Sequence, residues 1–445
     1  MIKDKKALTP ARILVGGFLS LILIGTILLS LPISSVEGSI GIIDALFTAT
    51  SAVCVTGLVV VDTGTHFTLF GQLVILGLIQ AGGLGFMTMA TLIFLLLGKK
   101  ITLKERLVIQ EALNQFSLEG LVRLTKYILI FTISIELIAA LFLGLRFSVD
   151  YGYKLGMYMG LFHSISAFAN AGFDIMGIVG QSSLMAYQND PVVVFIIMAL
   201  FVLGGLGFTV IVDIYKRHSF GKMALHSRFA LVLTGILLLI GFLGVFLLEY
   251  NNPDTLGEMP FYKKILPSIF TGATTRTAGF NTVDTGSLRP ATLFFMSVLM
   301  FIGASPASTG GGIKTTTFGV LLVSVVAMIK GDREVHIFNR RLPFEIVLKA
   351  LSIIMISLVI IGLATIILSR TEQQEFLNIF FEVVSAFGTV GLSTGITSEL
   401  TTVGRIIIIV IMFTGRVGPL TLALAFSQRM KSSNIRYPEE KVLVG

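Results

Sequence analysis

Charged residues are scarce in this chain. Only 13% of its 445 residues are Asp, Glu, Lys or Arg, and 54% are hydrophobic. A soluble chain usually carries about 25% charged residues. This composition excludes an ordinary soluble globular protein.

Cysteine and tryptophan are also nearly absent. The single cysteine, Cys54, excludes an intrachain disulfide, and without tryptophan an interfacial aromatic belt must consist of Tyr and Phe. The five histidines have no metal-binding spacing, and no credible catalytic set is present, so neither a zinc site nor an enzyme is supported. The dinucleotide-binding pattern Gly-x-Gly-x-x-Gly is missing too, so nucleotide control would have to come from a partner protein.

Long apolar runs are abundant. Eight of them approach or exceed the ~20 residues that cross a bilayer as a helix. They are residues 13–31, 70–97, 127–145, 192–214, 229–248, 293–329, 346–368 and 406–426. The first is too long for a signal-peptide core and is followed by no cleavage site, so we expect it to be retained. The sequence predicts an all-α membrane protein with eight transmembrane spans.

The basic residues indicate an orientation. With the N-terminus inside, the inside segments hold 23 of the 33 Lys and Arg residues and the outside segments hold seven. The positive-inside rule therefore places both termini in the cytoplasm, and the net charge of +8 needs no nucleic acid. Within segment 99–126, a capping-box pattern at Thr102 and Glu105 predicts a cytosolic helix, either on the inner membrane surface or docked on a partner.

Four of the outside connections contain the same pattern, a short apolar segment followed by a glycine turn. Their sequences are FTATSAVCVTGLVV, FHSISAFANAGFDI, IFTGATTRTAGFNT and FEVVSAFGTVGLST, with the turn glycines at Gly57, Gly172, Gly279 and Gly391. Successive glycines are 115, 107 and 112 residues apart. Between one glycine and the next the chain would cross the membrane twice, so the four units are parallel copies around an expected pseudo-fourfold axis.

Such turns point to an ion path. Inside a membrane, non-helical backbone is tolerated only where protein covers it or where it lines a watery path. Four turns facing one another would present rings of carbonyl oxygens that replace the water around a cation. The short helices before them would aim their partially negative C-terminal ends at the same axis, which also favours a cation.

The four repeated units resemble those of a known family. The fourth copy, Thr389, Val390 and Gly391, is similar to the core of potassium-channel filters, and the four units together resemble the Trk/Ktr/HKT superfamily of potassium transporters. The short N-terminus resembles the membrane subunit of a Ktr system more than a Trk protein. Some plant relatives that prefer sodium have Ser at the first filter position, and Gly57 here favours potassium.

The resemblance implies a selectivity filter made by backbone carbonyls. The implied ion contacts are Val55, Thr56 and Gly57; Asn170, Ala171 and Gly172; Thr277, Ala278 and Gly279; and Thr389, Val390 and Gly391. The second copy departs most from the pattern because Asn170 stands where Thr or Val is usual, so the innermost site is expected to be asymmetric.

The third unit carries an extra stretch, GASPASTGGGIKTTTFG at residues 303–319. It fails the Walker pattern because Ile313 separates Gly312 from Lys314. Pro306 and the three glycines should break the span there, and the many hydroxyls favour a water-lined loop over a simple kink. The resemblance implies that loop 303–317 is an intramembrane gate. The implied gate residues are Gly310, Gly311, Gly312, Lys314, Thr315 and, from the last span, Arg416.

Three further charged residues and two glycine motifs fall in apolar context. We expect Glu136, Glu382 and Arg276 each to have a polar partner, with Arg276 bracing the third turn from behind rather than touching an ion. The motif GGLGF occurs at 82–86 and 204–208, where we expect close-packing points or bends.

These patterns predict six parts. They are a first repeat (1–98), a cytosolic helix (99–126), a second repeat (127–217), a third repeat with the gate loop (218–330), a fourth repeat (331–428) and a cytosolic tail (429–445). The expected function is potassium uptake across the cytoplasmic membrane, and the alternative is an ion- or proton-coupled transporter with alternating access. The resemblance implies a homodimer regulated by a cytosolic nucleotide-binding ring of the RCK type, with potassium as the bound ion and sodium dependence left open.

Overall fold

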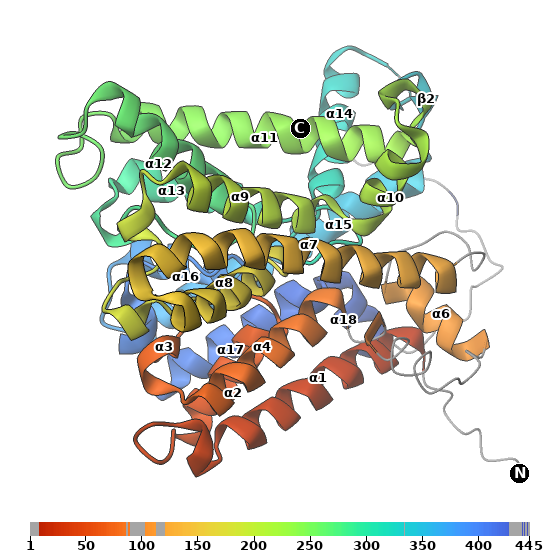
Figure 1. The fold of residues 1–445 in the computed structure, drawn as a ribbon. Helices are drawn as coiled ribbons and strands as arrows, with labels where there is room; N and C mark the ends of the chain where they lie inside the picture. Colours follow the sequence, from red (N-terminus) through yellow and green to blue (C-terminus); the bar gives the residue numbers. More distant parts are fainter. Residues whose placement is uncertain are drawn as a thin grey trace, which may run out of the picture.

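The computed structural model describes residues 9–85, 88–89, 103–112, 121–332 and 334–426, together with residues 438, 440 and 443. The expected cytosolic tail at 429–445 falls almost wholly outside these residues. The described part is mostly helical, and its long helices lie side by side (Figure 1). A mostly helical membrane fold is therefore confirmed.

Four helices are long and apolar enough to cross a membrane. They are α1 (Pro10–Leu29), α7 (Leu121–Tyr151), α11 (Leu225–Glu249) and α15 (Phe344–Thr371). Each contains a run of apolar residues without an internal proline, which allows an uninterrupted helix. Helix α7 begins six residues before the expected boundary at 127, since nothing between 121 and 126 breaks a helix.

A short helix follows each long helix. These are α2 (Ile42–Val53), α8 (Tyr153–Phe168), α12 (Phe261–Thr274) and α16 (Phe376–Gly388). The aromatic side chains of Phe47, Phe162 and Phe381, aligned in the four-copy pattern, are fully buried. In the third copy the aligned Ile269 is only partly buried, and its neighbour Phe270 is buried instead.

The second span of each unit is interrupted. The segments are α4 (Leu69–Leu84); α9 (Pro191–Leu206) with α10 (Phe208–Arg217); α13 (Pro290–Phe301) with α14 (Thr315–Ile329); and α17 (Thr402–Val417) with α18 (Pro419–Phe426). In the first, second and fourth units the break lies at a glycine with positive φ: Gly85 at 83°, Gly207 at 94° and Gly418 at 90°. Within the apolar runs 192–214 and 406–426, and after Leu84 in the run 70–97, glycine permits a backbone conformation that ends the helix.

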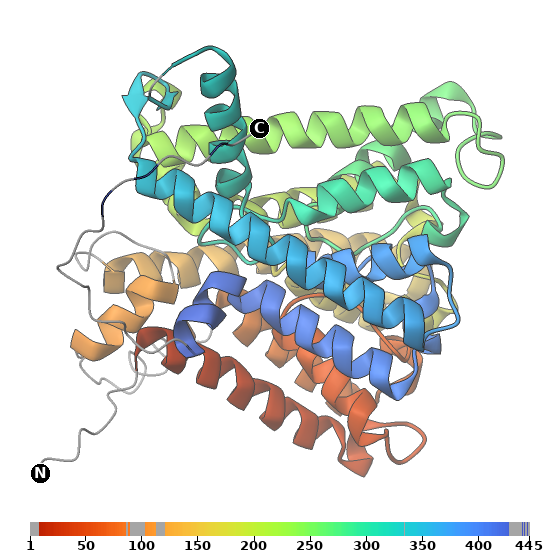
Figure 2. The same ribbon diagram turned by 180° about the vertical axis from the view of Figure 1, so that it is seen from behind.

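Because the breaks shorten the helices, fewer than eight helices in the described residues are long enough by themselves to cross a membrane. Among the described residues, four helices qualify, or five if α9 and α10, which meet at 96°, are counted as one bent span. The bend at Gly207 confirms the expectation for the second GGLGF motif. Helix α14 runs across the direction of α11 in both views (Figures 1 and 2).

The remaining elements are small. They are α3 (Thr63–His66), α6 (Leu103–Ala112), η1 (Pro32–Ser34), η2 (Met176–Val179), η3 (Met185–Tyr187), η4 (Phe220–Lys222), η5 (Thr285–Ser287) and η6 (Ile396–Glu399), with strands β1 (His336–Ile337) and β2 (Arg340–Arg341). The strands form an antiparallel hairpin, a small exception to the all-α prediction. Its two turn residues, Phe338 and Asn339, both have positive φ, as a tight hairpin turn demands. Of the expected helix at 99–126, residues 99–102 and 113–120 lie outside the described residues.

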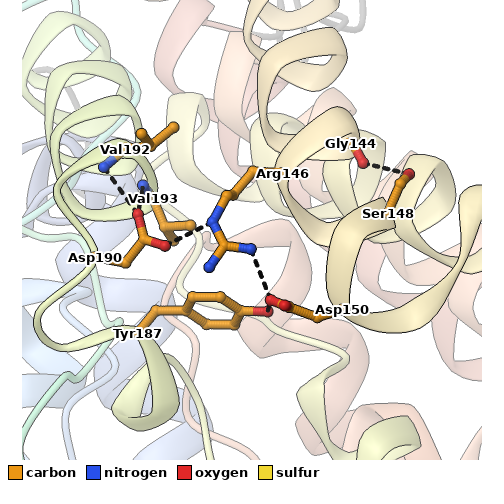
Figure 3. Close-up of polar contacts among 8 residues, drawn as sticks. All are labelled: Gly144, Arg146, Ser148, Asp150, Tyr187, Asp190, Val192 and Val193. Atoms are coloured by element: carbon orange, nitrogen blue, oxygen red, sulfur yellow. Dashed lines mark hydrogen bonds and ion pairs between the residues drawn. The ribbon is translucent and has the colours of Figure 1, made fainter.

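A polar network joins the end of α7 to the start of α9 (Figure 3). The Arg146 guanidinium donates to Asp190 at 2.7 Å and to Asp150 at 2.8 Å, and the Tyr187 hydroxyl donates to Asp150 at 2.7 Å. Asp190 also caps α9 by accepting from the backbone N–H of Val192. Burial raises the pKa of the Tyr187 phenol, so it stays protonated and remains a donor.

Candidate ion-binding site

The four glycine turns share one backbone conformation. The turn glycines Gly57, Gly172, Gly279 and Gly391 have φ of 91°, 69°, 77° and 91°. Two residues before each glycine, the chain again has positive φ: Val55 at 50°, Asn170 at 58°, Thr277 at 62° and Thr389 at 51°. Side chains rarely adopt this conformation, and β-branched ones least of all. Its occurrence at four matching positions means that the surrounding structure imposes it.

Hydroxyl groups of the short helices hold the turns in place. The Ser51 and Ser385 hydroxyls accept from the backbone N–H of Gly57 and Gly391 at 3.1 and 3.2 Å. In the second copy the Ser166 hydroxyl instead donates to the carbonyl O of Phe173 at 2.6 Å. The third copy has Ala273 at the aligned position, and the neighbouring Thr274 donates to the carbonyl O of Phe280 at 2.7 Å. Each turn is therefore fixed to its own helix by a buried hydroxyl.

The four turns lie next to one another in a closed order. A β-carbon on Gly57 would lie 2.6 Å from the carbonyl O of Ala171, and one on Gly172 would lie 2.8 Å from Cα of Gly279. A β-carbon on Gly279 would lie 2.6 Å from the carbonyl O of Val390, and one on Gly391 would meet the carbonyl O of Thr56. Each copy thus contacts the next, and the fourth contacts the first.

The structure brings together all twelve residues that the sequence singled out as ion contacts. All of them except Gly391 are buried. No side chain fits between adjacent turns, because the β-carbon of any other residue would collide with a neighbouring backbone atom. Backbone, rather than side chains, therefore faces backbone between neighbouring turns of this site.

Residues 302–314 form a non-helical segment between α13 and α14, so the predicted break is present, but residues 315–317 of the predicted loop 303–317 belong to the first turn of α14. A parallel bridge pairs Ile302 with Ile313, so the two ends of the segment lie side by side. One side of it lies against the break in the second unit, where Ser305 N–H donates to the carbonyl O of Gly205 at 2.9 Å and Phe208 N–H donates to that of Ala307 at 2.7 Å. We call residues 302–314 the intramembrane loop.

The loop also contacts the turns directly. The Thr309 hydroxyl donates to Oδ1 of Asn170 at 2.6 Å, and the backbone N–H of Gly311 donates to the Thr389 hydroxyl at 2.9 Å. A β-carbon on Gly310 would collide with the Thr277 hydroxyl. The loop is thus packed against the first residue of the second, third and fourth turns.

Arg416 and Lys314 make different contacts with the loop. The Arg416 guanidinium donates to the carbonyl O of Thr309 in the loop and to those of Gly82 and Gly83 at the end of α4. In the described part of the chain, the Lys314 ammonium donates to the carbonyl O of Gly310, at 2.7 Å, within the loop itself. Of the two, Arg416 is the residue that joins separate segments.

Neither cation has an acidic partner in the described part of the chain, where the ion pairs involve other residues. Among the described residues, the hydrogen bonds of both cations go to backbone carbonyl groups, and the Arg416 guanidinium also lies 5.9 Å from the centre of the Phe18 ring.

Arg276 braces the loop at both of its ends. Its guanidinium donates to the carbonyl O of Ile302 at 2.6 Å and to the Thr315 hydroxyl at 2.8 Å. The Thr315 hydroxyl in turn donates to the carbonyl O of Gly303 at 3.1 Å. The predicted polar partner is confirmed, and the hydrogen bonds of the Arg276 guanidinium support the loop.

Glu136 and Glu382, both buried, also have the expected partners. Oε2 of Glu136 accepts from the Gln80 amide at 3.0 Å, and Glu382 accepts from the Thr397 hydroxyl.

The GGLGF glycines belong to a spacing that is repeated in a third unit. Gly82, Gly204 and Gly415 each stand three residues before the glycine that breaks the second span. A β-carbon on each would collide with the carbonyl O of Val53, Phe168 or Phe387, near the end of the short helix of the same unit. Close packing is thus confirmed for both GGLGF motifs, and aligning Gly415 to Gly418 with them would have revealed the third.

Comparison with known proteins identifies the family. The model of the TrkH cation transport protein family matches residues 5–437. The chain belongs to the TrkH family.

Several relatives match along almost their whole length. The chain is 53% identical to Ktr system potassium uptake protein B of Bacillus subtilis (strain 168), with 98% of this chain and 97% of that protein covered. It is 43% identical to the protein of the same name from Vibrio alginolyticus, covering 100% and 96%. It is 41% identical to the potassium/sodium uptake protein NtpJ of Enterococcus hirae, covering 99% and 98%.

The fold resembles a solved structure of the same family. The crystal structure of the potassium transporter TrkH from Vibrio parahaemolyticus superimposes with a TM-score of 0.71, covering 95% of this chain and 86% of that one. The two share 19% sequence identity, so this likeness supports the fold alone.

Proposed function

We propose that this protein takes up potassium ions across the cytoplasmic membrane through a selectivity filter built from the four glycine turns. The observation that carries the proposal is the closed order of four turns with the same backbone conformation. The names of the relatives at 53% and 43% identity, both potassium uptake proteins, support potassium as the ion.

The ion contacts would be the backbone carbonyls of the twelve residues from Val55–Thr56–Gly57 to Thr389–Val390–Gly391. Alternating backbone conformations turn successive carbonyl groups toward one side of a chain, which suits rings of oxygen atoms around a dehydrated cation. The short helices α2, α8, α12 and α16 all end at these turns, so their partially negative ends add to the attraction. Four such units around one path, with eight spans, make up the proposed architecture.

We further propose that the intramembrane loop is a gate below the filter. Gly310, Gly311 and Gly312 give the loop backbone freedom, and Thr315 anchors its end through Arg276. Arg416 and Lys314 place two positive charges at this level without an acidic partner among the described residues. Two like charges repel strongly where water is scarce, so a potassium ion would pass only after the loop and its cations move aside.

The assembly that we propose is a homodimer whose termini lie in the cytoplasm and whose gate is controlled by a cytosolic RCK-type nucleotide-binding ring. The word "system" in the names of two relatives supports a partner. The chain would bind potassium and no other cofactor, and it would follow the six-part division from repeat 1–98 to tail 429–445.

One alternative has a specific observation in its favour. The relative at 41% identity is named a potassium/sodium uptake protein, and this name supports a sodium-coupled transporter as the alternative. A coupled transporter needs the second ion for every transport cycle, whereas a channel-like path does not.

The test is rubidium uptake into proteoliposomes that contain the purified protein, with sodium present or absent. We expect uptake driven by the rubidium gradient alone and inhibited by potassium but not by sodium. Uptake that requires a sodium gradient would favour the coupled transporter. Uptake equal to that of empty vesicles, from protein that elutes as a single folded species, would contradict the proposal.

A further inference from the structure

Asn170 differs from its counterparts in the other turns, and backbone conformation does not explain the difference. Its φ of 58° suits asparagine, which tolerates the left-handed region. However, Val55, Thr277 and Thr389 adopt nearly the same φ at the matching positions. The site therefore does not need asparagine for its backbone, and the side chain must serve another purpose.

The Asn170 amide lies fully buried between four segments. Its Oδ1 accepts from the Thr309 hydroxyl of the intramembrane loop at 2.6 Å. Its Nδ2 lies 3.2 Å from the carbonyl O of Phe201 and 3.4 Å from that of Arg276. Because both carbonyl oxygens can only accept, the nitrogen must face them, and the oxygen must face Thr309. The amide orientation is thus fixed by its partners.

Thr309 is held from two sides. Its hydroxyl donates to Asn170, and its carbonyl O accepts from Arg416 of α17. Two residues later, the N–H of Gly311 donates to the Thr389 hydroxyl. In the order of contacts among the glycines, the second and fourth turns stand opposite each other. The loop therefore contacts three turns in succession, from Asn170 of the second, past Thr277 of the third, to Thr389 of the fourth.

We propose that Asn170 is a positioning residue that latches the intramembrane loop to the base of the turns. The inference rests on the proposed function, in which this loop obstructs the ion path. While the hydrogen bond between Asn170 and Thr309 persists, the loop stays under the turns. When it breaks, the side chain of Thr309 loses its bond to the second turn, and the contacts that remain in the described residues include those of Arg416 and Thr389 and the backbone bonds of Thr309 to Gly204 and of Gly312 to Gly415.

The size of the effect follows from the bond. The free energy of a buried hydrogen bond between neutral groups changes an equilibrium constant by roughly two- to tenfold. Loss of this bond should therefore raise the open fraction, and with it the flux, by about two- to tenfold. Discrimination between potassium and sodium should not change, because the bond acts on the loop and leaves the turn carbonyls in place.

The test uses the full-length protein in proteoliposomes, with rubidium uptake and its competition by potassium and sodium as readouts. Thr309→Val keeps the side-chain shape and the carbonyl that Arg416 binds but removes the hydroxyl. We expect higher uptake with unchanged ion competition, and Thr309→Ser, which keeps a hydroxyl, should return uptake toward the unsubstituted level. Thr234→Val in α11 is the matched control, since this buried hydroxyl has no hydrogen-bond partner within the described residues.

A second variant tests whether the effect of Thr309→Val depends on Asn170. Asn170→Thr places in the second turn the residue that the third and fourth turns already have at this position. In that background Thr309→Val should add no further increase, because the bond is already lost. Equal, additive increases in both backgrounds would overturn the latch, as would lower uptake or altered ion competition in Thr309→Val alone. If the unsubstituted protein itself took up no rubidium, the proposed function would fail rather than the latch.

Discussion

Replacing Gly57 by serine tests whether the four turns select the ion. Gly57 has φ of 91°, and a β-carbon there would lie 2.6 Å from the carbonyl O of Ala171 and 3.1 Å from Cα of Gly172. The first of these atoms is itself a proposed ion contact. Serine at this position must therefore displace the second turn, and with it one of the oxygen atoms that would hold potassium.

The expected loss can be estimated from the strain. A non-glycine residue in a rarely populated backbone region costs on the order of 1–3 kcal/mol. Part of that strain is relieved if the neighbouring turn moves outward, and this movement widens the ring of carbonyl oxygens. Since about 1.4 kcal/mol corresponds to a tenfold ratio, we expect discrimination between potassium and sodium to fall by about tenfold.

The measurement is rubidium uptake in the presence of graded potassium or sodium. Gly77→Ser in α4 is the matched control, because a β-carbon at Gly77 would have no other atom within 4 Å. We expect the control to keep the selectivity of the unsubstituted protein. Unchanged selectivity in a folded Gly57→Ser variant would show that ions are selected elsewhere.

Three further changes address the loop and the fold. Deleting residues 309–314 should raise rubidium uptake, since the contacts of Arg416 and the turns with the loop are lost; unaltered or abolished uptake in a folded variant would argue against a gate. Arg416→Gln should also raise uptake several-fold, because it removes a positive charge and the bond to Thr309, and reduced uptake would contradict this role. Arg146→Ala should lower the free energy of unfolding by about 1 kcal/mol in a denaturant titration, through loss of the ion pairs with Asp150 and Asp190, without changing ion selectivity.

The turns could be predicted because their causes are local. A glycine with positive φ, a hydroxyl-bearing short helix before it and a spacing repeated four times are all visible in the chain itself. The break at 302–314 was likewise predictable, since Pro306 and three consecutive glycines disfavour a helix.

The contacts of the loop were not predictable, because they join residues far apart in sequence. Asn170 and Thr309 are 139 positions apart, and Arg416 and Thr309 are 107 apart. Hydrophobic periodicity carries no information about which buried polar groups will meet. The sequence therefore indicated that Arg416 and Asn170 were unusual, and only the fold reveals that both hold Thr309.

The different requirements of a filter and of a gate explain why the proposed filter is nearly symmetric and the proposed gate is not. Selecting a cation requires oxygen atoms on all sides, so all four units keep the glycine turn. Obstructing a narrow path requires only one segment, and in the described residues a long loop between second-span helices occurs in the third unit, whereas a single glycine separates them in the second and fourth. The fourth unit differs in a complementary way, because Arg416 stands where the first unit has Gly83 in the same Gly-x-x-Gly spacing. The guanidinium of Arg416 donates to the carbonyl groups of Gly82 and Gly83 in the first unit and to that of Thr309 in the loop. The departures from fourfold symmetry in the third and fourth units thus meet at one contact, and the proposed gate is built from them.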